Sequence, residues 1–479
     1  MATPIPSNTC SFSLREVTAA TGGTLTRQIE TDVTGVTTDS RAIGAGTLFV
    51  ALRGSRFNGH DYLPAAAAHG AAAAIVERGQ SHVSLPCIEV DDTLRALGAL
   101  ARHHLERIRA RTGLRVIAVG GANGKTSTKE LSAALATALF GPTLKTAGNL
   151  NNLIGVPMTI FTLAENYRAA VIECGTNQRG EVAQLTGILR PDVALVLNVD
   201  IEHSEGLGTI DEIADEEASL FDCAAAAVAC FEETKVTARI PAGLRTITFG
   251  RSESADVRFD RTVTATPERS AIELHLAPAM VDAGVEPRLR VRLNLLGPAA
   301  ASNAAAAMAA VGAAIARPLS RAELERMVSA LEAVPPVPGR LNARIIGAIV
   351  VIDDTYNANP RSVRVALETA SEIAHARKSR LIIALGDMLE LGAVSGQMHR
   401  EAIRDVAAAS PAEFIAVGPL VGAAWRAEAG HSSISSVHSF ANSLDAAQQI
   451  TEIVRPGDVL LVKGSRGIAM ERLIAALES

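Results

Sequence analysis

The sequence has no excess of basic residues, and this lack excludes one class of partner. It contains 45 Lys and Arg against 51 Asp and Glu, which gives a formal net charge of −6 at pH 7. A protein that binds nucleic acid usually carries a basic face that holds the phosphate backbone. The charge balance therefore argues against DNA or RNA as a partner.

Cysteine pairs, a leader peptide and strongly apolar runs are also missing. The five cysteines are odd in number and form no C-x-x-C motif, which favours reduced thiols. The opening residues MATPIPSNTC lack both the basic and the apolar region of a signal peptide. Apolar runs such as 65–74 are rich in alanine and interrupted by polar residues, so we expect no membrane span. Together these features predict a cytoplasmic protein.

The length of 479 residues is too great for one hydrophobic core, and three blocks emerge along the chain. The first block, 1–106, carries short strand-like pieces such as 47–52 and an alanine-rich helix near 64–74. A charged helical stretch at 103–111 connects it to the second block, 107–334. The proline-rich sequence 334–339 cannot continue a helix and is the clearest linker; it leads into the third block, 335–479.

The second and third blocks alternate apolar runs with helical segments, which is typical of parallel α/β units. We expect strands in the second block at 114–119, 169–172 and 193–197, and in the third at 348–352, 381–385, 414–417 and 459–462. Residues 231–296 instead alternate like antiparallel strands, for example at 272–276 and 289–293. They predict an insertion or a sheet edge.

A glycine-rich turn lies between the strand 114–119 and the helix that follows. Its sequence, Gly121-Ala-Asn-Gly124-Lys125-Thr126, is the short G-x-x-G-K-[ST] form of a P-loop. Glycines let backbone amides approach phosphate oxygens, and the helix N-terminus adds a positive dipole end. Lys125 can reach the β and γ phosphates, and the Thr126 hydroxyl can bind Mg²⁺. The motif predicts binding of a nucleoside triphosphate.

Polar residues follow the predicted strands of both α/β blocks. In open parallel sheets, ligands bind beyond the carboxyl ends of the strands, and carboxylates there suit Mg²⁺. The residues at these ends are Glu173, Asn198, Asp354, Asp387 and Lys463. Each could instead be a helix N-cap or part of a solvated turn.

Two further polar segments are candidates. His203 lies in the polar loop after the strand 193–197, where a structural role is the alternative to metal binding. The turn Lys463-Gly-Ser-Arg466-Gly467 could hold a carboxylate or a phosphate with its side chains and amides, or be a capped surface turn.

The sequence resembles the Mur ligase family in motifs spread over nearly the whole chain. The motifs are Thr38–Arg41 with Gly46–Gly54 and Gly59–Asp61, the P-loop, Ala147–Asn152 with Gly155–Pro157, Asp354–Pro360, and Leu385–Gly392 with His399. Asp354–Pro360 resembles the family member that adds D-alanyl-D-alanine. Relatives that add diaminopimelate or lysine usually carry an Asp-Tyr-Ala-His-Thr-Pro-like stretch there.

The resemblance implies an α/β fold of three domains. These are a small mixed α/β N-terminal domain that binds a UDP-substrate, a central P-loop ATPase-like parallel-sheet domain and a C-terminal Rossmann-like domain. The implied activity is ATP-dependent, ADP-forming ligation of D-alanyl-D-alanine to UDP-N-acetylmuramoyl-tripeptide through an acyl phosphate, with Mg²⁺. This reaction belongs to peptidoglycan biosynthesis, and so to cell wall biogenesis, cell shape and cell division. A monomer is the default expectation.

The resemblance also implies roles for single residues. Lys125 stabilises the transferring phosphoryl group, Thr126 and Glu173 hold one Mg²⁺, and His203 helps to hold a second. The implied ATP contacts are Gly121, Asn123, Gly124, Lys125, Thr126, Ser127, Asn303, Arg340, Tyr356, Asn357 and Asn359. The implied substrate contacts are Ser40, Arg41, Asn149, Asn151, Asn152, Asp387, Lys463 and Arg466.

The sequence departs from the family pattern at two places. Relatives carry a His-Asn pair after the glycine that aligns with Gly297, where this chain has Ala299 and Ala300. Relatives also place a carbamylated lysine where this chain has Glu217. Glu217 would supply a carboxylate to the metal site without modification. The alternative for residues 215–217 is a solvated acidic face.

Other functions stay open at this point. One is a different ligase of the same superfamily, such as the tripeptide-forming member or a folylpolyglutamate-type synthetase. Another is a degenerate protein that binds a nucleotide or UDP-sugar without catalysis. The sequence does not say whether residue three of the muramoyl tripeptide is diaminopimelate or lysine.

Overall fold

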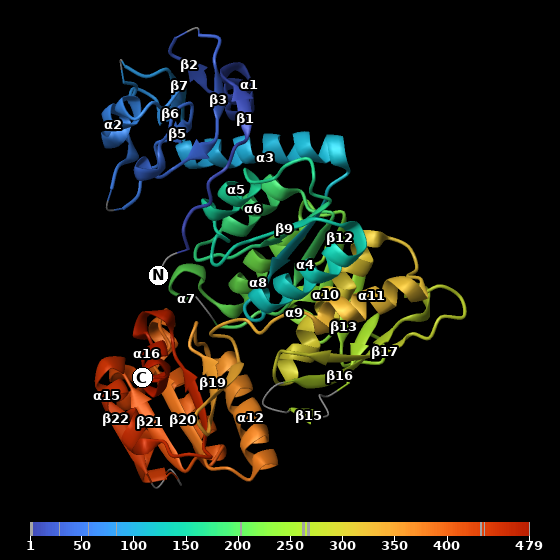
Figure 1. The fold of residues 1–479 in the computed structure, drawn as a ribbon, viewed down its shortest axis with the longest axis vertical. Coiled ribbons are helices and arrows are strands. Elements are labelled where there is room, and N and C mark those ends of the chain that lie inside the picture. Colours follow the sequence, from blue (N-terminus) through green and yellow to red (C-terminus); the bar gives the residue numbers. More distant parts are fainter. Residues whose placement is uncertain are drawn as a thin grey trace. The chain divides into compact units, whose positions relative to one another are not determined.

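The computed structural model describes residues 3–27, 29–55, 57–82, 84–201, 204–260, 264–265, 269–431, 434 and 436–478. It confirms the α/β class (Figure 1). Two compact units can be separated: Met1–Gly120, Phe140–Leu195 and Ser219–Ala227 form one, and Gly121–Leu139, Val196–Ala218 and Val228–Ser479 form the other.

The N-terminal part contains a small mixed sheet with the order β2-β7-β6-β5-β4 and a separate pair, β1-β3. Its strands are β1 (Ser11–Ser13), β2 (Thr24–Leu25), β3 (Asp32–Thr34), β4 (Val36–Thr37), β5 (Leu48–Val50), β6 (Ala73–Glu77) and β7 (Cys87–Val90). Its helices are α1 (Leu14–Thr21), α2 (Leu63–Ala68) and α3 (Thr93–Thr112). The domain boundary expected after residue 106 falls inside α3.

The helix predicted near 64–74 is shorter than expected. Helix α2 ends at Ala68, and Gly70 follows with a φ of +85°, a conformation that turns the chain out of the helix. Ala73 and Ala74 then begin β6, which is buried and pairs in parallel with β5. Periodicity alone does not separate such a short alanine-rich segment into helix and strand.

The central part is built on a ten-stranded sheet with the order β15-β16-β14-β13-β12-β11-β8-β10-β9, in which β17 pairs with β16. Its strands are β8 (Arg115–Gly120), β9 (Thr143–Lys145), β10 (Ala169–Glu173), β11 (Val193–Val196), β12 (Ala226–Cys230), β13 (Arg245–Gly250), β14 (Val257–Phe259), β15 (Thr264–Ala265), β16 (Ser270–Leu276) and β17 (Arg288–Leu293). Strands β8 and β10 pair in parallel, as the sequence predicts, and β9, which was not predicted, pairs in parallel with β10.

The antiparallel character of 231–296 is confirmed in its second half. Strand β16 pairs antiparallel with both β14 and β17, and Ile272 lies opposite Val291. These strands lie at one end of the ten-stranded sheet, as expected for a sheet edge. The helices of the central part are α4 (Lys125–Phe140), α5 (Gly155–Ile160), α6 (Glu181–Leu189), α7 (Ser204–Leu207), α8 (Ile210–Ala218), α9 (Thr234–Thr237), α10 (Pro298–Ile315) and α11 (Arg321–Glu332).

Helix α10 is rich in alanine and mostly buried, because its small side chains allow close packing on β13 and β14. Within the described residues it is the one helix that is long and apolar enough to cross a membrane, with a mean hydropathy of 1.3. This helix was not singled out from the sequence, where we expected no membrane span. However, 72% of the helix is buried inside the protein, as in a core helix.

The C-terminal part has a six-stranded sheet of order β18-β19-β23-β20-β21-β22, parallel except for β18 (Figure 1). Its strands are β18 (Asn342–Ile346), β19 (Ile349–Asp354), β20 (Leu381–Gly386), β21 (Glu413–Val417), β22 (Val437–Phe440) and β23 (Val459–Lys463). The four predicted strands are confirmed, whereas β18 and β22 were not predicted. The segment 334–339, between α11 and β18, has no helix or strand, as expected for a linker.

Helices cover both faces of the C-terminal sheet, which confirms the doubly wound pattern. They are α12 (Pro360–Arg377), α13 (Ser395–Ala408), α14 (Pro419–Glu428), α15 (Ser443–Ile453) and α16 (Glu471–Glu478). Helices α12, α13 and α14 pack in one apolar core, and α15 and α16 pack in the core on the other face. The carboxyl ends of five parallel strands thus meet at one edge.

Candidate active site

The P-loop connects β8 to α4, and two of its residues must be glycine. Gly121 has a φ of +108°, and a Cβ there would lie 2.8 Å from the Leu197 amide nitrogen. Gly124 has a φ of +91°, and a Cβ there would lie 2.5 Å from Oδ1 of Asn303. The loop is therefore closely packed from both sides. Asn303, an expected ATP contact, lies directly beside it.

Asn198 holds the loop in shape from the end of β11. Its Oδ1 accepts the Asn123 amide at 2.9 Å, its Nδ2 donates to the Asn123 carbonyl at 2.9 Å, and its own carbonyl accepts the Ala122 amide at 2.8 Å. Three bonds from one residue fix the backbone that would meet the phosphates. We identified Asn198 from the sequence only as a polar strand end; its position after an apolar run was the available signal.

Lys125 folds back over the loop at the start of α4. Its Nζ donates to the Gly121 carbonyl at 2.5 Å and to the Ala122 carbonyl at 3.2 Å. Thr126 and Ser127 follow in the first turn, where the helix dipole favours an anion. The arrangement places an ammonium group, a hydroxyl and helix amides at one loop.

Glu217 reaches the P-loop from α8. It is only 2% exposed, and its Oε2 accepts the Gly121 amide at 2.6 Å. The alternative of a solvated acidic face is contradicted for Glu217, because its side chain is buried. Asp215 does face outward, and its side chain is 66% exposed and bonded to Arg239. A buried carboxylate therefore lies directly against the first glycine of the P-loop.

Glu173 ends β10 and is buried. In the sheet register it lies opposite Val119, two residues before the P-loop begins. Its Oε1 accepts Nδ2 of Asn151 at 2.9 Å, and its amide donates to the Thr146 hydroxyl. The structure thus brings Glu173 together with the loop 149–152, which carries three asparagines. The sequence assigned Glu173 to the metal and these asparagines to the substrate.

The other asparagines of this loop have different surroundings. Oδ1 of Asn152 accepts the amides of Ile154 and Gly155 at the start of α5, which is a helix-capping role. Asn149 is exposed, and its amide donates to the Thr3 hydroxyl at 3.2 Å. Asn149 and Asn152 are exposed, whereas Asn151 is half-buried.

Ser40 and Arg41 lie in a short 3-10 helix of the N-terminal part, Ser40–Ala42. The Arg41 guanidinium binds Asp39 through two nitrogens, at 2.9 and 2.8 Å. These bonds lower the pKa of the Asp39 carboxyl group. The Arg41 side chain is otherwise exposed and accessible to a ligand.

The loop after β19 carries Tyr356, whose ring contacts two arginines. The Arg340 guanidinium carbon is 4.2 Å from the ring centroid and that of Arg466 is 5.9 Å from it. Such contacts orient the ring through its negative face. The sequence assigned Tyr356 and Arg340 to ATP and Arg466 to a substrate, and the structure places them together.

Lys463 lies beneath this loop. Its Nζ donates to Asp354 at 2.6 Å and to the Asn357 carbonyl at 2.9 Å, and its side chain is 2% exposed. A buried ion pair of this kind holds the loop that contains Asn357. The structure therefore shows Lys463 supporting the loop that carries an expected ATP contact.

Asp387 follows β20 and is also buried. Its carboxylate accepts the amides of Leu420 and Val421, at 3.2 and 2.8 Å, and so caps α14. Gly418, with a φ of +108°, lets the chain pass close to it, since a Cβ there would meet the carboxylate at 2.5 Å. The geometry assigns Asp387 a helix-capping role.

Ser465 links the three strand-end loops of the C-terminal sheet and was not singled out from the sequence. Its amide donates to the Asp387 carbonyl at 3.1 Å, and its hydroxyl accepts the Leu389 amide at 2.9 Å. The same hydroxyl donates to the Ala358 carbonyl at 3.4 Å. Small hydroxyl residues are common in turns, so the sequence carried no signal for this role.

His399, from the motif with Leu385–Gly392, supports one of these loops. Its Nδ1 donates to the Ser395 carbonyl at 2.7 Å and its Nε2 accepts the Met388 amide at 3.0 Å. Burial lowers the pKa of His399, which favours the neutral ring that this pair of bonds requires. His203, the other candidate histidine, lies outside the described residues.

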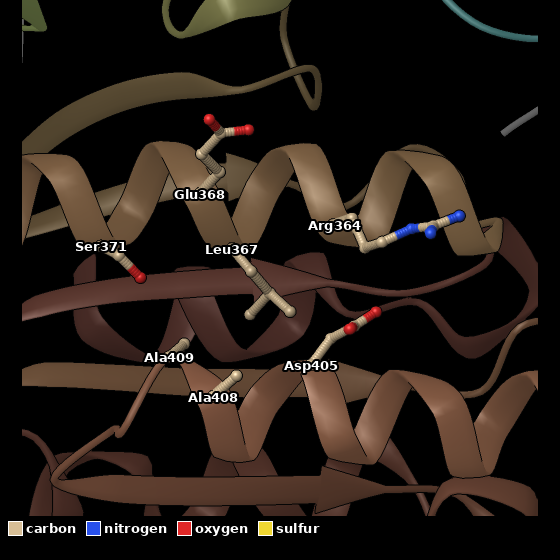
Figure 2. A pocket seen from close by; sticks show the side chains of 7 residues that line it. All are labelled: Arg364, Leu367, Glu368, Ser371, Asp405, Ala408 and Ala409. Carbon is tan, nitrogen blue, oxygen red and sulfur yellow. The ribbon is translucent and has the colours of Figure 1, made fainter.

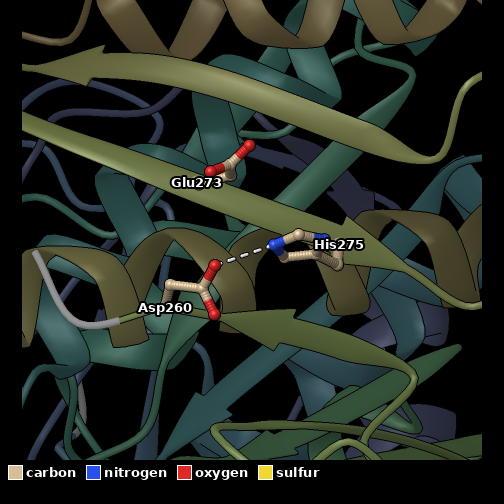
Figure 3. Close-up of side chains that lie close together, drawn as sticks. All are labelled: Asp260, Glu273 and His275. Carbon is tan, nitrogen blue, oxygen red and sulfur yellow. Dashed lines mark hydrogen bonds and ion pairs between the residues drawn. The ribbon is translucent and has the colours of Figure 1, made fainter.

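Two features away from the P-loop also resemble sites. The ligand atoms of Asp260, Glu273 and His275 lie within 4.8 Å of one another (Figure 3). His275 is bonded to Asp260 at 2.9 Å, and Glu273 is paired with Arg288. A hydrogen bond and an ion pair therefore account for the cluster.

The second feature is a cavity of about 230 Å³ between α12 and α13 (Figure 2). Its lining residues are Arg364, Leu367, Glu368, Ser371, Asp405, Ala408 and Ala409. Burial raises the pKa of Asp405 there. None of the residues expected from the sequence to act on ATP or substrate lines this cavity.

Comparisons with known proteins agree with the site's geometry. Three family models match the chain: "Mur ligase family, catalytic domain" at 32–105, "Mur ligase middle domain" at 119–311 and "Mur ligase, glutamate ligase domain" at 339–466. The chain is 33% identical to the UDP-N-acetylmuramoyl-tripeptide–D-alanyl-D-alanine ligase of Escherichia coli, over 98% of each chain. It is 30% identical to the ligase of that name from Mycobacterium tuberculosis, over 92% of this chain and 91% of the relative.

Solved structures give the same result. MurF from Acinetobacter baumannii superposes with a TM-score of 0.85 and 30% identity, over 99% of this chain and 100% of that one. MurF ligase from Thermotoga maritima, solved in complex with ADP, gives 0.79 and 25%, over 92% and 96%. A folylpolyglutamate synthase from Mycobacterium tuberculosis, at 17% identity and a TM-score of 0.59, shares the fold. On the sequence motifs, the P-loop geometry and these matches, the chain belongs to the Mur ligase family.

Proposed function

We propose that the chain is an ATP-dependent ligase that joins D-alanyl-D-alanine to UDP-N-acetylmuramoyl-tripeptide and releases ADP and phosphate. The observation that carries the proposal is the match, over 98% of both chains, to the Escherichia coli ligase of that name. The geometry supports it, because a P-loop with Lys125 at its helix start lies against a buried carboxylate, Glu217. The product would be the UDP-muramoyl pentapeptide of peptidoglycan biosynthesis.

The residues present fit ATP with Mg²⁺. Mg²⁺ prefers oxygen ligands and keeps much of its water, and the Thr126 hydroxyl and the Glu173 carboxylate would hold it. Glu217 would contribute its charge at the P-loop, and His203 would help to hold a second ion. Bound Mg²⁺ supplies charge neutralisation for the phosphates.

The reaction has two steps. The C-terminal carboxylate of the tripeptide attacks the γ-phosphorus of ATP, the bond to the β–γ bridging oxygen breaks, and ADP leaves. The amine of D-alanyl-D-alanine then attacks the acyl carbon, phosphate leaves, and the nitrogen loses a proton. Lys125 balances the charge of the transferring phosphoryl group. The protein mainly positions the reactants and keeps water from the acyl phosphate.

We assign the reactants to three domains. Residues 1–106, with Ser40 and Arg41, would bind the UDP-substrate, and 107–334 would bind ATP and the tripeptide end near Asn149 and Asn151. Residues 335–479 would close over ATP and bring the dipeptide. In that domain Arg466, whose side chain is 49% exposed, is the candidate for the dipeptide carboxylate, since Asp387 and Lys463 are engaged in buried bonds.

The pair missing from the family pattern lies at the start of α10, where Ala300 is 2% exposed. Neither Ala299 nor Ala300 can bond a nucleotide base through its side chain. Tyr356, whose ring contacts the guanidinium groups of Arg340 and Arg466, is an aromatic residue in a loop expected at ATP. We assign the base contact to this ring. The protein would act in the cytoplasm as a monomer.

An ADP-release assay with purified protein tests the function. We expect turnover with ATP, UDP-muramoyl-tripeptide and D-alanyl-D-alanine together, and much less when D-alanine, lysine or glutamate replaces the dipeptide. Turnover only with a single amino acid would indicate the tripeptide-forming or folylpolyglutamate-type reaction. Nucleotide binding without any turnover would indicate a binding protein. Tripeptides with diaminopimelate or lysine at residue three would be compared in parallel.

A further inference from the structure

The side chain of Asn123 joins the P-loop to the C-terminal part of the chain. Asn359 stands at the N-cap of α12, and its Nδ2 donates to Oδ1 of Asn123 at 2.9 Å. The two residues are 236 positions apart in the sequence. This bond therefore connects the phosphate loop directly to the first turn of a helix in the C-terminal domain.

The bonds around Asn359 determine how both amide groups are oriented. Oδ1 of Asn359 accepts the Ser362 amide at 2.9 Å in a capping box, so its Nδ2 must be the atom that faces Asn123. A donor there requires an acceptor, and Asn123 presents Oδ1. The Nδ2 of Asn123 is then directed away from Asn359.

That Nδ2 is buried, and among the described residues it has no hydrogen-bond partner. Leaving a buried donor unsatisfied is unfavourable, so such atoms are rare and usually have a ligand or water. Asn123 precedes Gly124 and Lys125, which are the residues of the loop expected to meet phosphate. A nucleotide bound to this loop would supply a phosphoryl oxygen as the acceptor.

The backbone of Asn123 cannot easily relax to satisfy this donor elsewhere. Asn198 binds both its amide and its carbonyl, each at 2.9 Å. The side chain thus extends from a fixed point, with Oδ1 engaged toward α12 and Nδ2 open to a ligand of the loop.

The geometry points to Asn123 and Asn359 as a positioning pair that couples phosphate in the P-loop to the placement of α12. Phosphate that accepts from Nδ2 fixes the Asn123 amide in the orientation whose Oδ1 binds Asn359. Without phosphate, only the bond from Asn359 favours this orientation, and the buried Nδ2 of Asn123 has no acceptor among the described residues. The inference rests on the proposed function only in naming ATP as the source of the phosphate.

One substitution breaks the link while keeping the helix cap. In Asn359→Ser the hydroxyl can still accept the Ser362 amide, since serine caps helices about as well as asparagine, but it is too short to reach Asn123. Asn442→Ser is the matched control, because Asn442 is also an N-cap in the C-terminal part. It caps α15 by accepting the amides of Leu444 and Asp445. Asn123→Ala removes the side chain and leaves the backbone bonds to Asn198 available.

Calorimetry with a non-hydrolysable ATP analogue, without the other substrates, measures the coupling. We expect Asn123→Ala to weaken analogue binding by about 10-fold or more, which is the loss of a bond to a charged group. Asn359→Ser should weaken it by roughly 5-fold, and the double variant should bind no more weakly than Asn123→Ala alone. Asn442→Ser should bind like wild type.

Hydrogen exchange at 361–365, in the first turns of α12, provides a readout that a purely structural role would not change. The analogue should slow exchange there in wild type and in Asn442→Ser, and leave it unchanged in Asn123→Ala and Asn359→Ser. Adenosine, which lacks phosphates, should give no protection in any of them. Additive losses in the double variant, or equal protection in all variants, would overturn the inference. Because neither experiment contains the peptide substrates, failure of the ligase reaction would be seen separately in the ADP-release assay.

Discussion

Replacing Glu217 with glutamine removes one negative charge at the P-loop and keeps the shape of the side chain. The carboxylate is buried and accepts the Gly121 amide at 2.6 Å, a short distance typical of a charged acceptor. The glutamine oxygen can still accept this amide, so we expect the variant to fold. A hydrogen bond to a charged group contributes about 1.5–3 kcal/mol and a neutral one about 1 kcal/mol, so the bond weakens by roughly 0.5–2 kcal/mol.

This weakening acts on the loop that holds the phosphates, and the lost charge also lowers the attraction for Mg²⁺. We expect kcat/KM for ATP to fall by about 10-fold or more, and the Mg²⁺ concentration for half-maximal turnover to rise. ADP release measured across a Mg²⁺ series gives both values. Asp215→Asn is the control, because this residue lies on the same helix with an exposed side chain. If Glu217→Gln matches wild type at every Mg²⁺ concentration, Glu217 has no part in the metal site.

A second substitution at the same position tests the comparison with the carbamylated lysine of relatives. Glu217→Lys should be inactive in buffer freed of carbon dioxide and should regain part of its activity when bicarbonate is supplied. Wild type should respond to neither condition, since Glu217 is a carboxylate without modification. A bicarbonate requirement in wild type would contradict this reasoning.

Three other changes have expected outcomes. Lys125→Ala should lower kcat by about 100-fold or more, because about 3 kcal/mol or more of transition-state stabilisation is lost, while the protein unfolds at the wild-type temperature. Near-normal turnover would show that Lys125 has no part in the reaction. Ser465→Ala should leave the Leu389 amide without its acceptor and raise KM for the dipeptide by roughly 5-fold, while Ser465→Thr retains most activity. Burial lowers the pKa of His104 from 6.5 to about 4, so its neutral form, bonded to the Leu163 carbonyl, stabilises the fold above pH 6.5. This contribution, up to about 3 kcal/mol, should be lost as the pH falls from 6.5 to 4 in urea unfolding of wild type, and His104→Gln should show a flatter dependence.

Much of the fold could be predicted from the sequence because parallel strands are buried on both faces. The runs at 114–119 and 381–385 are apolar throughout and end abruptly at polar residues, which identifies both the strand and its functional end. Strands β18 and β22 were missed because they are not buried in this way. They lie at the two edges of the C-terminal sheet and carry exposed or half-buried side chains, so they lack a continuous apolar pattern.

The places of the P-loop glycines, Lys125 and Glu173 in the fold were predictable, because each lies where an apolar strand ends or the next helix begins. The sequence could not show how polar side chains divide between ligand and scaffold, because an aspartate that caps a helix and one that binds a substrate look alike in the sequence. Asp387 and Lys463 were assigned to substrate, and the structure shows them in buried bonds within the C-terminal domain.

The alanine helix α10 has a consequence for how the chain is made. As it leaves the ribosome, it is apolar enough to be mistaken for a segment destined for a lipid bilayer. The strands it packs on, β13, β14 and β16, all precede it in the sequence and so are already synthesised when it emerges. Because of this order, the helix has a surface to pack on as soon as it emerges. A circular permutation that places α10 before β13, β14 and β16 would leave the helix exposed until these strands are synthesised.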